Sequence, residues 1–206
     1  MSDTLFSVEG LGVGFDTPHG ESPHVGVIED LSFSLERNRT QALVGESGCG
    51  KSLTALAILG LLPPFARITA GKMSFDGTDL THFNDAQMTQ LRGNRISMIF
   101  QEPMSALNPV FSVGWQIAES LRLHKQLSAA EARELAVESL ASVGIPDPTS
   151  RAGDYPHQLS GGMRQRVMIA MALACDPDIL IADEPTTALD VTIQAQIIDL
   201  ILDLQD

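Results

Sequence analysis

Basic residues are scarce in this chain. Its 206 residues include 13 lysines and arginines against 26 aspartates and glutamates, which gives a formal net charge of −13. A protein that binds duplex or single-stranded nucleic acid needs a basic stripe that displaces counterions from the phosphates. The acidic balance therefore argues against nucleic acid as a partner.

Cysteines and long apolar runs are also lacking. Cys49 and Cys175 are too few for a disulfide framework, which favours a reducing, cytosolic setting. The N-terminus does not show the basic stretch and apolar run of a secretory signal. The most apolar window, 53–66, is interrupted by Pro63 and Pro64 and is too short to cross a bilayer. We therefore expect a soluble protein that reaches any membrane through a partner.

A glycine-rich segment supplies the first chemistry. Residues 45–52 read GESGCGKS, which satisfies the phosphate-loop pattern G-x-x-x-x-G-K-[ST]. Its glycines let backbone N–H groups turn toward phosphates, and the helix that follows directs its positive dipole end at the same anion. A chance match is expected in roughly one chain in a hundred of this length. The strand and helix predicted on either side make chance a poor explanation.

Each part of this loop has an expected role. Lys51 is expected to reach the β- and γ-phosphates, and the Ser52 hydroxyl to ligate Mg²⁺. The residues predicted to surround the nucleotide are Gly45, Glu46, Ser47, Gly48, Cys49, Gly50, Lys51, Ser52 and Leu53.

Two adjacent carboxylates follow a second apolar strand. Residues 179–185 read ILIADEP, and their apolar residues on both faces indicate a central strand. Asp183 and Glu184 then emerge at the carboxyl end of the strand, where ligands bind in open α/β sheets. Asp183 is placed to hold Mg²⁺ through its water shell, and Glu184 to polarise a water for in-line attack on the γ-phosphate. An acidic turn is common in isolation, but less so beside a phosphate loop.

Residue patterns predict strands in the first half of the chain and helices after it. Alternating apolar residues predict strands over 5–15, 27–35 and 40–44, and the short run 96–100 predicts a buried strand. The turn-rich stretch 16–26 reads as a hairpin loop.

Three helices are also predicted before residue 145. One follows the phosphate loop and ends before Pro63; its buried side is expected to hold Leu53, Leu56, Ala57 and Leu59. The others cover 113–124 and 129–143, and the second of these carries a capping box at Ser128 and Glu131 and ends at Gly144. Together the elements indicate an α/β nucleotide core with a helical insertion.

Five segments in this order resemble the nucleotide-binding domain of ATP-binding-cassette (ABC) transporters over essentially the whole chain. They are the phosphate loop, Gln101, LSGGM at 159–163, ILIADEP, and TALD at 187–190. The longer stretches 101–114, 155–173 and 183–197 resemble the peptide, nickel and glutathione importers, most closely the ATP-binding subunit of the glutathione importer.

The resemblance implies a fold and a set of partners. The fold is a P-loop NTPase (RecA-like) core with an antiparallel β subdomain and a helical insertion, divided as 1–100, 101–158 and 159–206. The implied function is that of an ATP-binding subunit of an importer of dipeptides, oligopeptides, glutathione or nickel, with ATP and Mg²⁺ as cofactors. It would sit at the cytoplasmic face of the inner membrane. Its partners would be a second nucleotide-binding domain, paired head to tail, two membrane permease subunits and, indirectly, a periplasmic solute-binding protein. The surface around 102–109 is expected to receive a cytoplasmic helix of the permease.

The resemblance also implies roles for individual residues. Ser160, Gly161 and Gly162 would bind the γ-phosphate held by the partner cassette, an arrangement that a helix N-terminus supports on physical grounds. Gln101 would contact Mg²⁺ and the attacking water. Asp190 would meet the partner's phosphate loop, although it could equally cap the helix predicted over 191–204. Phe15 would stack on adenine, although an ordinary core phenylalanine fits its position about as well.

Three departures from the family pattern stand out. Met163 replaces a glutamine that is common in the wider family, and Cys49 places a thiol inside the phosphate loop, next to Lys51. The family's histidine beyond the 191–204 helix has no counterpart, because all five histidines precede Asp183. We therefore expect the chain to be a fragment with weak or absent ATPase activity by itself and residual nucleotide binding.

Two other functions fit parts of the pattern. A cassette ATPase of DNA repair would carry long coiled coils between Gln101 and Ser160, where no sustained heptad repeat occurs, and translation types usually carry tandem cassettes with basic linkers. A binding module in which ATP only controls dimerisation is the other alternative, and a turnover assay separates it from an enzyme.

Overall fold

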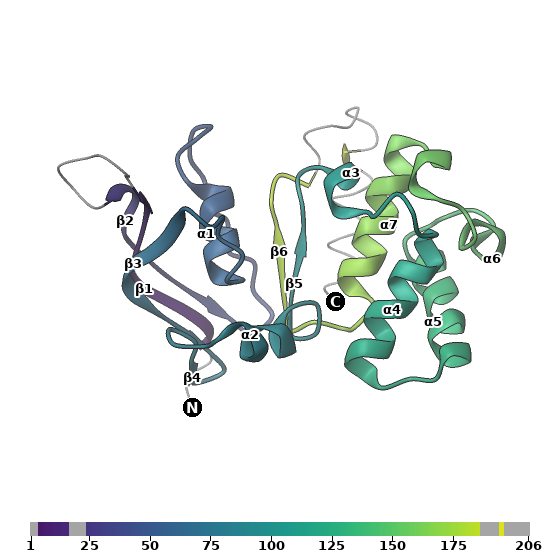
Figure 1. Cartoon of the computed structure of the whole chain (residues 1–206), viewed down its shortest axis with the longest axis horizontal. Coiled ribbons are helices and arrows are strands. Elements are labelled where there is room, and N and C mark those ends of the chain that lie inside the picture. The colour runs from purple at the N-terminus through teal and green to yellow at the C-terminus, as the bar shows by residue number, and fades with distance from the viewer. Residues whose placement is uncertain (1–3, 17–23, 186–193, 196–206) are drawn as a thin grey trace. The chain divides into compact units, whose positions relative to one another are not determined.

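The computed structural model describes residues 4–16, 24–185 and 194–195 (Figure 1). Asp190 lies outside these residues, as does the helix predicted over 191–204 except for residues 194–195, which are helical. The chain forms two compact units, 1–89 and 90–206. The finer predicted division at 100 and 158 stays a prediction.

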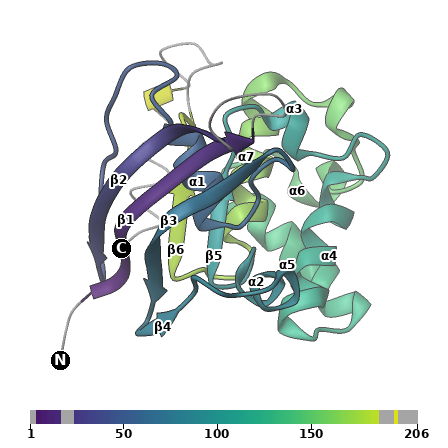
Figure 2. The same cartoon turned by 60° about the vertical axis from the view of Figure 1, so that its left-hand side comes forward.

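An antiparallel sheet forms most of the first unit. Its strands are β1 (Thr4–Asp16), β2 (His24–Glu36), β3 (Ala66–Phe75) and β4 (Thr78–Asp79), in the order β2-β1-β3-β4. The three long strands run side by side in Figure 2. The strands predicted over 5–15 and 27–35 are confirmed, and the pair Asp16↔His24 closes the predicted hairpin. The sequence patterns did not predict β3 or β4.

The central strand β1 carries the buried side chains of this unit. Five apolar residues along it are at most 5 % exposed, and β2 and β3 pair with it on its two edges. These residues are Leu5, Phe6, Val8, Leu11 and Val13.

The strand predicted over 40–44 is wrong. These residues form no ladder with any described strand, and Val44 is 90 % exposed. Alternating apolar residues express only a preference for a pleated, half-buried surface, so they form a strand only where a neighbouring strand accepts their backbone hydrogen bonds.

The helix after the phosphate loop is confirmed as α1 (Lys51–Ile58), but its buried face is rotated from the predicted one. Ala57 and Leu59 are buried as expected, whereas Leu53 and Leu56 are only half-buried. The small side chains of Thr54 and Ala55 take their place, since small residues let the helix pack closely. A short helix α2 (Asp85–Leu91) follows in the chain.

The second unit combines helices with a short parallel pair of strands, and α7 packs against one of them. The strands β5 (Ile96–Ile99) and β6 (Ile179–Ala182) pair in parallel from Ile96↔Ile179 to Ile99↔Ala182. All of β5 is buried, as predicted. In β6 only Ile179 is buried, so the expected burial of this strand on both faces is not met among the described residues, where β6 has one neighbouring strand.

The helical block of this unit matches the predicted insertion. Its helices are α3 (Pro103–Ala106), α4 (Val113–Lys125), α5 (Ala129–Ser142), α6 (Pro148–Arg151), a 3₁₀ turn (Pro156–Gln158) and α7 (Gly161–Leu173). Figure 1 shows α4, α5 and α7 packed together. Their shared core includes Ile117, Leu121, Leu140, Val143 and Ile169, each at most 2 % exposed.

The predicted capping box of α5 is confirmed. The Ser128 N–H donates to Glu131 Oε2 at 2.9 Å, and the Glu131 N–H donates to Ser128 Oγ at 3.3 Å. Gly144, which follows the helix, has a φ of 73°, a conformation that favours glycine. Among the described helices, none has the length and apolarity to span a membrane.

Candidate functional site

The backbone of the phosphate loop depends on its glycines. Gly48 and Gly50 have φ angles of 82° and 100°, which are strained for any residue with a side chain. A Cβ at Gly50 would also lie 3.0 Å from Ile28 Cγ1, and one at Gly45 only 2.4 Å from Cys49 Sγ. Residues with side chains would therefore strain the backbone at Gly48 and Gly50 and would meet a neighbouring side chain at Gly45 and Gly50.

Lys51 bends back over the start of this loop. Its Nζ donates to the carbonyl oxygens of Gly45 at 2.9 Å and Glu46 at 3.0 Å. The next residue, Ser52, is exposed in the first turn of α1, while Leu53 is half-buried. An anion between the loop and the helix would draw the ammonium group away from these carbonyls, since an ammonium group bonds an anionic oxygen more strongly than a neutral carbonyl oxygen.

The second unit brings Gln101 and Glu184 together. Parallel strands end at the same edge of a sheet, and the Asp183 N–H continues the ladder by donating to Ile99 O at 3.0 Å. Just beyond, Gln101 Nε2 donates to Glu184 Oε2 at 3.1 Å. Glu184 has a φ of 45°, a left-handed conformation that a glutamate adopts only under constraint. Strain of this kind concentrates at functional sites.

Gln165 holds the turn that follows Glu184. This side chain is only 2 % exposed on α7, and its Nε2 donates to the carbonyl oxygen of Pro185 at 2.6 Å. The bond connects the turn to the helix that begins at the LSGGM segment. The sequence analysis did not single out this residue, which stands between Arg164 and Arg166 in the sequence and so carries no local sign of burial.

The LSGGM segment forms a helix N-terminus. Leu159 is buried, while Ser160 is exposed and caps α7 by accepting from the Met163 N–H at 3.3 Å. The helix begins at Gly161, where a Cβ would meet open space. The N–H groups at a helix start have no intrahelical acceptors, so those of Gly161 and Gly162 are available to an anion.

Residues 28–187 match the protein-family profile described as ABC transporter. The chain belongs to the ABC transporter family.

Comparisons with curated proteins and solved structures agree with this membership. The chain is 53 % identical over 204 residues to the dipeptide transport ATP-binding protein of Bacillus subtilis, covering 98 % of this chain and 60 % of that protein. It is 53 % identical over 210 residues to the glutathione import ATP-binding protein of Salmonella choleraesuis, covering 99 % of this chain and 33 % of that protein. A solved dimeric ATP-binding cassette, in a post-hydrolysis state with ADP and phosphate, superposes with a TM-score of 0.85 at 27 % identity. That superposition covers 98 % of this chain and 83 % of the cassette. The chain thus spans about 60 % of the length of its dipeptide-transport relative.

The site residues predicted for this ABC protein are divided between its two units. The phosphate loop and Phe15 lie in the first unit, whereas Gln101, Ser160 and the two carboxylates lie in the second. Phe15 is half-buried at the end of β1, where its ring stacks on Phe65, so it is not a fully enclosed core residue. Asp190 falls outside the described residues.

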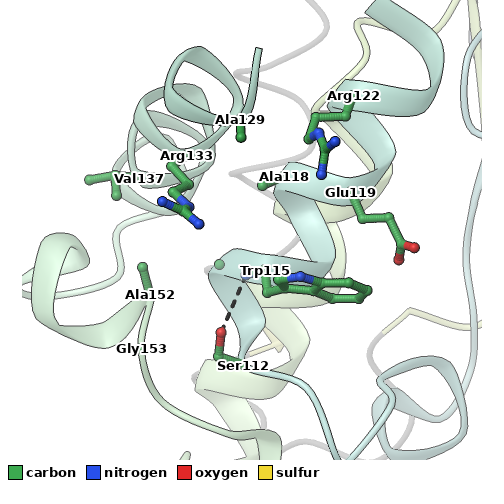
Figure 3. Close-up of a pocket in the computed structure, with 11 residues that line it drawn as sticks. Ser112, Trp115, Ala118, Glu119, Arg122, Ala129, Arg133, Val137, Ala152 and Gly153 are labelled. Carbon is green, nitrogen blue, oxygen red and sulfur yellow. Dashed lines mark hydrogen bonds between the residues drawn. The ribbon is translucent and has the colours of Figure 1, made fainter. Parts of the chain in front are cut away.

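The helical block of this ABC protein also holds a cavity of about 380 Å³. It is lined mainly by α4 and α5, with Ala152 and Gly153 from the segment after α6. Figure 3 shows the guanidinium groups of Arg122 and Arg133 directed into it from the two helices. Among the described residues, neither arginine has an ion pair or a hydrogen-bonded side-chain partner.

Exposed apolar side chains lie close by along the chain. Val110 is 68 % exposed, Met104 49 % and Trp115 41 %, and the Trp115 ring stacks on Phe111 with centroids 4.1 Å apart. The buried Gln116 amide fixes this segment, because its Oε1 accepts from the Asn108 N–H and its Nε2 donates to two carbonyl oxygens.

Proposed function

We propose that this chain is the ATP-binding part of an importer of dipeptides, oligopeptides or related small solutes such as glutathione. ATP binding and hydrolysis would drive transport across the inner membrane, with the chain at its cytoplasmic face. The observation that carries the proposal is the Gln101–Glu184 pair on a strained turn, in a chain that also has a phosphate loop. The names of its relatives, which include dipeptide and glutathione import proteins, support the solute class.

In this proposal the phosphate loop binds the triphosphate of ATP. The backbone N–H groups of 45–52 surround its oxygens, and Lys51 exchanges the carbonyls of Gly45 and Glu46 for the β- and γ-phosphates. Phe15 stacks on the adenine from the end of β1. These contacts position the γ-phosphate for attack.

The residues predicted to hold Mg²⁺ offer the donors that this ion prefers. Ser52 and Gln101 offer a hydroxyl and an amide oxygen, which are hard oxygen donors, and the Asp183 carboxylate would hold the ion through its water shell. Mg²⁺ bound there would neutralise charge that develops on the phosphates. Glu184 accepts the proton of the attacking water, and Gln101, which already bonds its carboxylate, orients both.

The helix N-terminus at 160–162 is proposed to serve a second cassette. Its open N–H groups would bind the γ-phosphate held by the partner, so each ATP would be shared across a head-to-tail dimer. The solved relative is a dimer. Size-exclusion chromatography with light scattering of the Glu184→Gln variant is expected to show a dimer with Mg-ATP and a monomer with Mg-ADP. A monomer in both nucleotides would contradict the pairing.

The permease is proposed to dock on the helical block. The exposed apolar side chains at 104–115 suit an amphipathic helix, and the two guanidinium groups in the cavity suit a carboxylate on it. Arg122→Glu and Arg133→Glu are expected to reduce co-purification with the permease subunits. Arg39→Glu, the same charge change on an exposed residue of the first unit, is the matched control.

A chimera tests the proposed function. This chain replaces the 204 aligned residues of the B. subtilis dipeptide transport ATP-binding protein, and uptake of a radiolabelled dipeptide is measured in cells that lack that protein. Uptake that requires Glu184 would support the proposal. A chimera that is produced at the normal level and joins its permease, but imports neither dipeptide nor glutathione, would contradict it.

A further inference from the structure

Phe15 and Phe65 form an aromatic pair on the surface of the first unit. Their ring centroids lie 5.7 Å apart with 27° between the planes. Phe65 is 59 % exposed, and Val25, which pairs with Phe15 on the neighbouring strand, is 57 % exposed. Single exposed apolar residues are ordinary, whereas a group of them commonly marks a binding surface.

The backbone holds the two rings in this arrangement. Phe15 pairs with Ala66, the first residue of β3, and the Asp16 N–H donates to the carbonyl oxygen of Phe65 at 2.9 Å. The side chains of Asp16 and Arg67 form an ion pair at 3.2 Å beside this bond. Phe65 is therefore fixed against the end of β1 by its own main chain.

The ring of Phe15 lies on the face of the sheet that carries the phosphate loop. Val13 pairs with Ile28, whose side chain is the group that a Cβ at Gly50 would meet. Phe15 is two residues further along β1, and side chains two apart point to the same face. Phe15 thus lies about 7 Å along the strand from Val13, the residue paired with the Ile28 that faces the loop.

We propose that Phe65 is a positioning residue for the nucleotide base. It packs against Phe15 and fixes the plane of the ring that stacks on adenine, an inference that rests on the proposed ATP-binding function. Without Phe65, the Phe15 ring at the end of the strand would be free to change rotamer in the unbound protein. It would lose this freedom when a base bound, and the entropic cost would weaken binding. Phe65 thus strengthens binding of the base and leaves binding of the phosphates unchanged.

The test compares ATP with inorganic tripolyphosphate, which has the phosphates but no base. Dissociation constants of both, with Mg²⁺, are measured by calorimetry for the 206-residue chain and its variants. Phe65→Ala is expected to weaken ATP binding about fivefold and to leave tripolyphosphate binding unchanged, while Phe65→Tyr keeps the wild-type affinity. Leu61→Ala removes another exposed apolar side chain from the same connecting segment and is the matched control. In Phe15→Ala, the second change Phe65→Ala should have no further effect.

Several results would overturn the proposal. The positioning role is rejected, while ATP binding stands, by any of three results. These are an unchanged ATP affinity in Phe65→Ala, an equal loss of affinity for ATP and tripolyphosphate, or a further loss of ATP affinity in the double variant. Absence of ATP and tripolyphosphate binding by the wild-type chain would reject the proposed function itself, and the base site with it.

Discussion

Gln101 donates its side-chain amide to the carboxylate of Glu184 at 3.1 Å, although the two residues lie on different strand ends far apart in the sequence. The parallel pairing of β5 with β6 produces this contact. An amide that already bonds the carboxylate is well placed to hold a water beside it.

Replacement of Glu184 by glutamine is expected to stop turnover without loss of ATP affinity. The amide keeps the shape of the side chain but is too weak a base to accept a proton from water. The rate of phosphate release by the chimeric transporter measures this, and we expect a decrease of at least about 100-fold. Glu36→Gln, at an exposed position at the end of β2, is the control and should retain normal turnover. Normal turnover in Glu184→Gln would remove this residue from the mechanism.

Gln165→Met is expected to destabilise the second unit. The variant keeps the volume of the side chain but leaves the Pro185 carbonyl oxygen without its 2.6 Å donor. Loss of such a buried bond costs about 1–3 kcal/mol, which urea denaturation can resolve. Gln90→Met, at an exposed position of α2, should change the free energy of unfolding by less than about 0.5 kcal/mol. Equal effects of the two variants would show that the bond contributes nothing.

The two cysteines are expected to react differently with alkylating reagents. Cys49 is exposed in the phosphate loop, 4.0 Å from Lys51 Nζ, so alkylation should be rapid, slow ATP binding and be prevented by bound nucleotide. Burial raises the pKa of the Cys175 thiol, although its contact with Ser120 opposes this, so less thiolate forms at neutral pH and the residue should react slowly. Mass spectrometry after timed exposure to iodoacetamide distinguishes the sites. Equal modification of Cys49 with and without ATP would place the nucleotide elsewhere.

The capping box of α5 predicts a pH-dependent stability. Hydrogen bonds from Ser128, first from its side chain and then from its backbone, lower the pKa of Glu131 in the folded chain. A folded pKa below the unfolded one adds stability above the unfolded pKa, and this stability is lost as the pH falls through the folded pKa. Glu131→Ala should therefore lower the melting temperature more at pH 7 than at pH 3. Glu134→Ala, on the same helix, is the control and should change the melting temperature little at either pH. An equal decrease in melting temperature for Glu131→Ala at the two pH values would exclude the charge of Glu131 as the cause.

The features that could be predicted correctly from the sequence are those that depend on residues close together in the chain. The capping box at Ser128, the glycine after α5 and the buried strand β5 each depend on neighbouring residues, so their patterns predicted them. The phosphate loop is likewise a continuous motif. The order of the segments then implied that Gln101 and Glu184 share a site, and the structure brings these two side chains together.

Contacts between distant segments were harder to predict. The strand expected over 40–44 failed because its formation depends on a neighbouring strand, not on its own residues. The bond from Gln165 to Pro185 and the stacking of Phe65 on Phe15 depend on how separate elements pack, and no local pattern encodes that packing. The rotated face of α1 has the same origin, since either side of a short apolar helix can be buried.

Calorimetric titration of Mg-ATP into the wild-type chain and its Lys51→Ala variant tests the central claim most directly. Lys51 makes bonds to phosphate oxygens in the proposed complex, and bonds to charged groups contribute about 1.5–3 kcal/mol. We predict saturable binding of one ATP by the wild-type chain and an affinity about 10- to 100-fold lower in the variant. No binding by the wild-type chain, or equal affinities of the two proteins, would contradict the account.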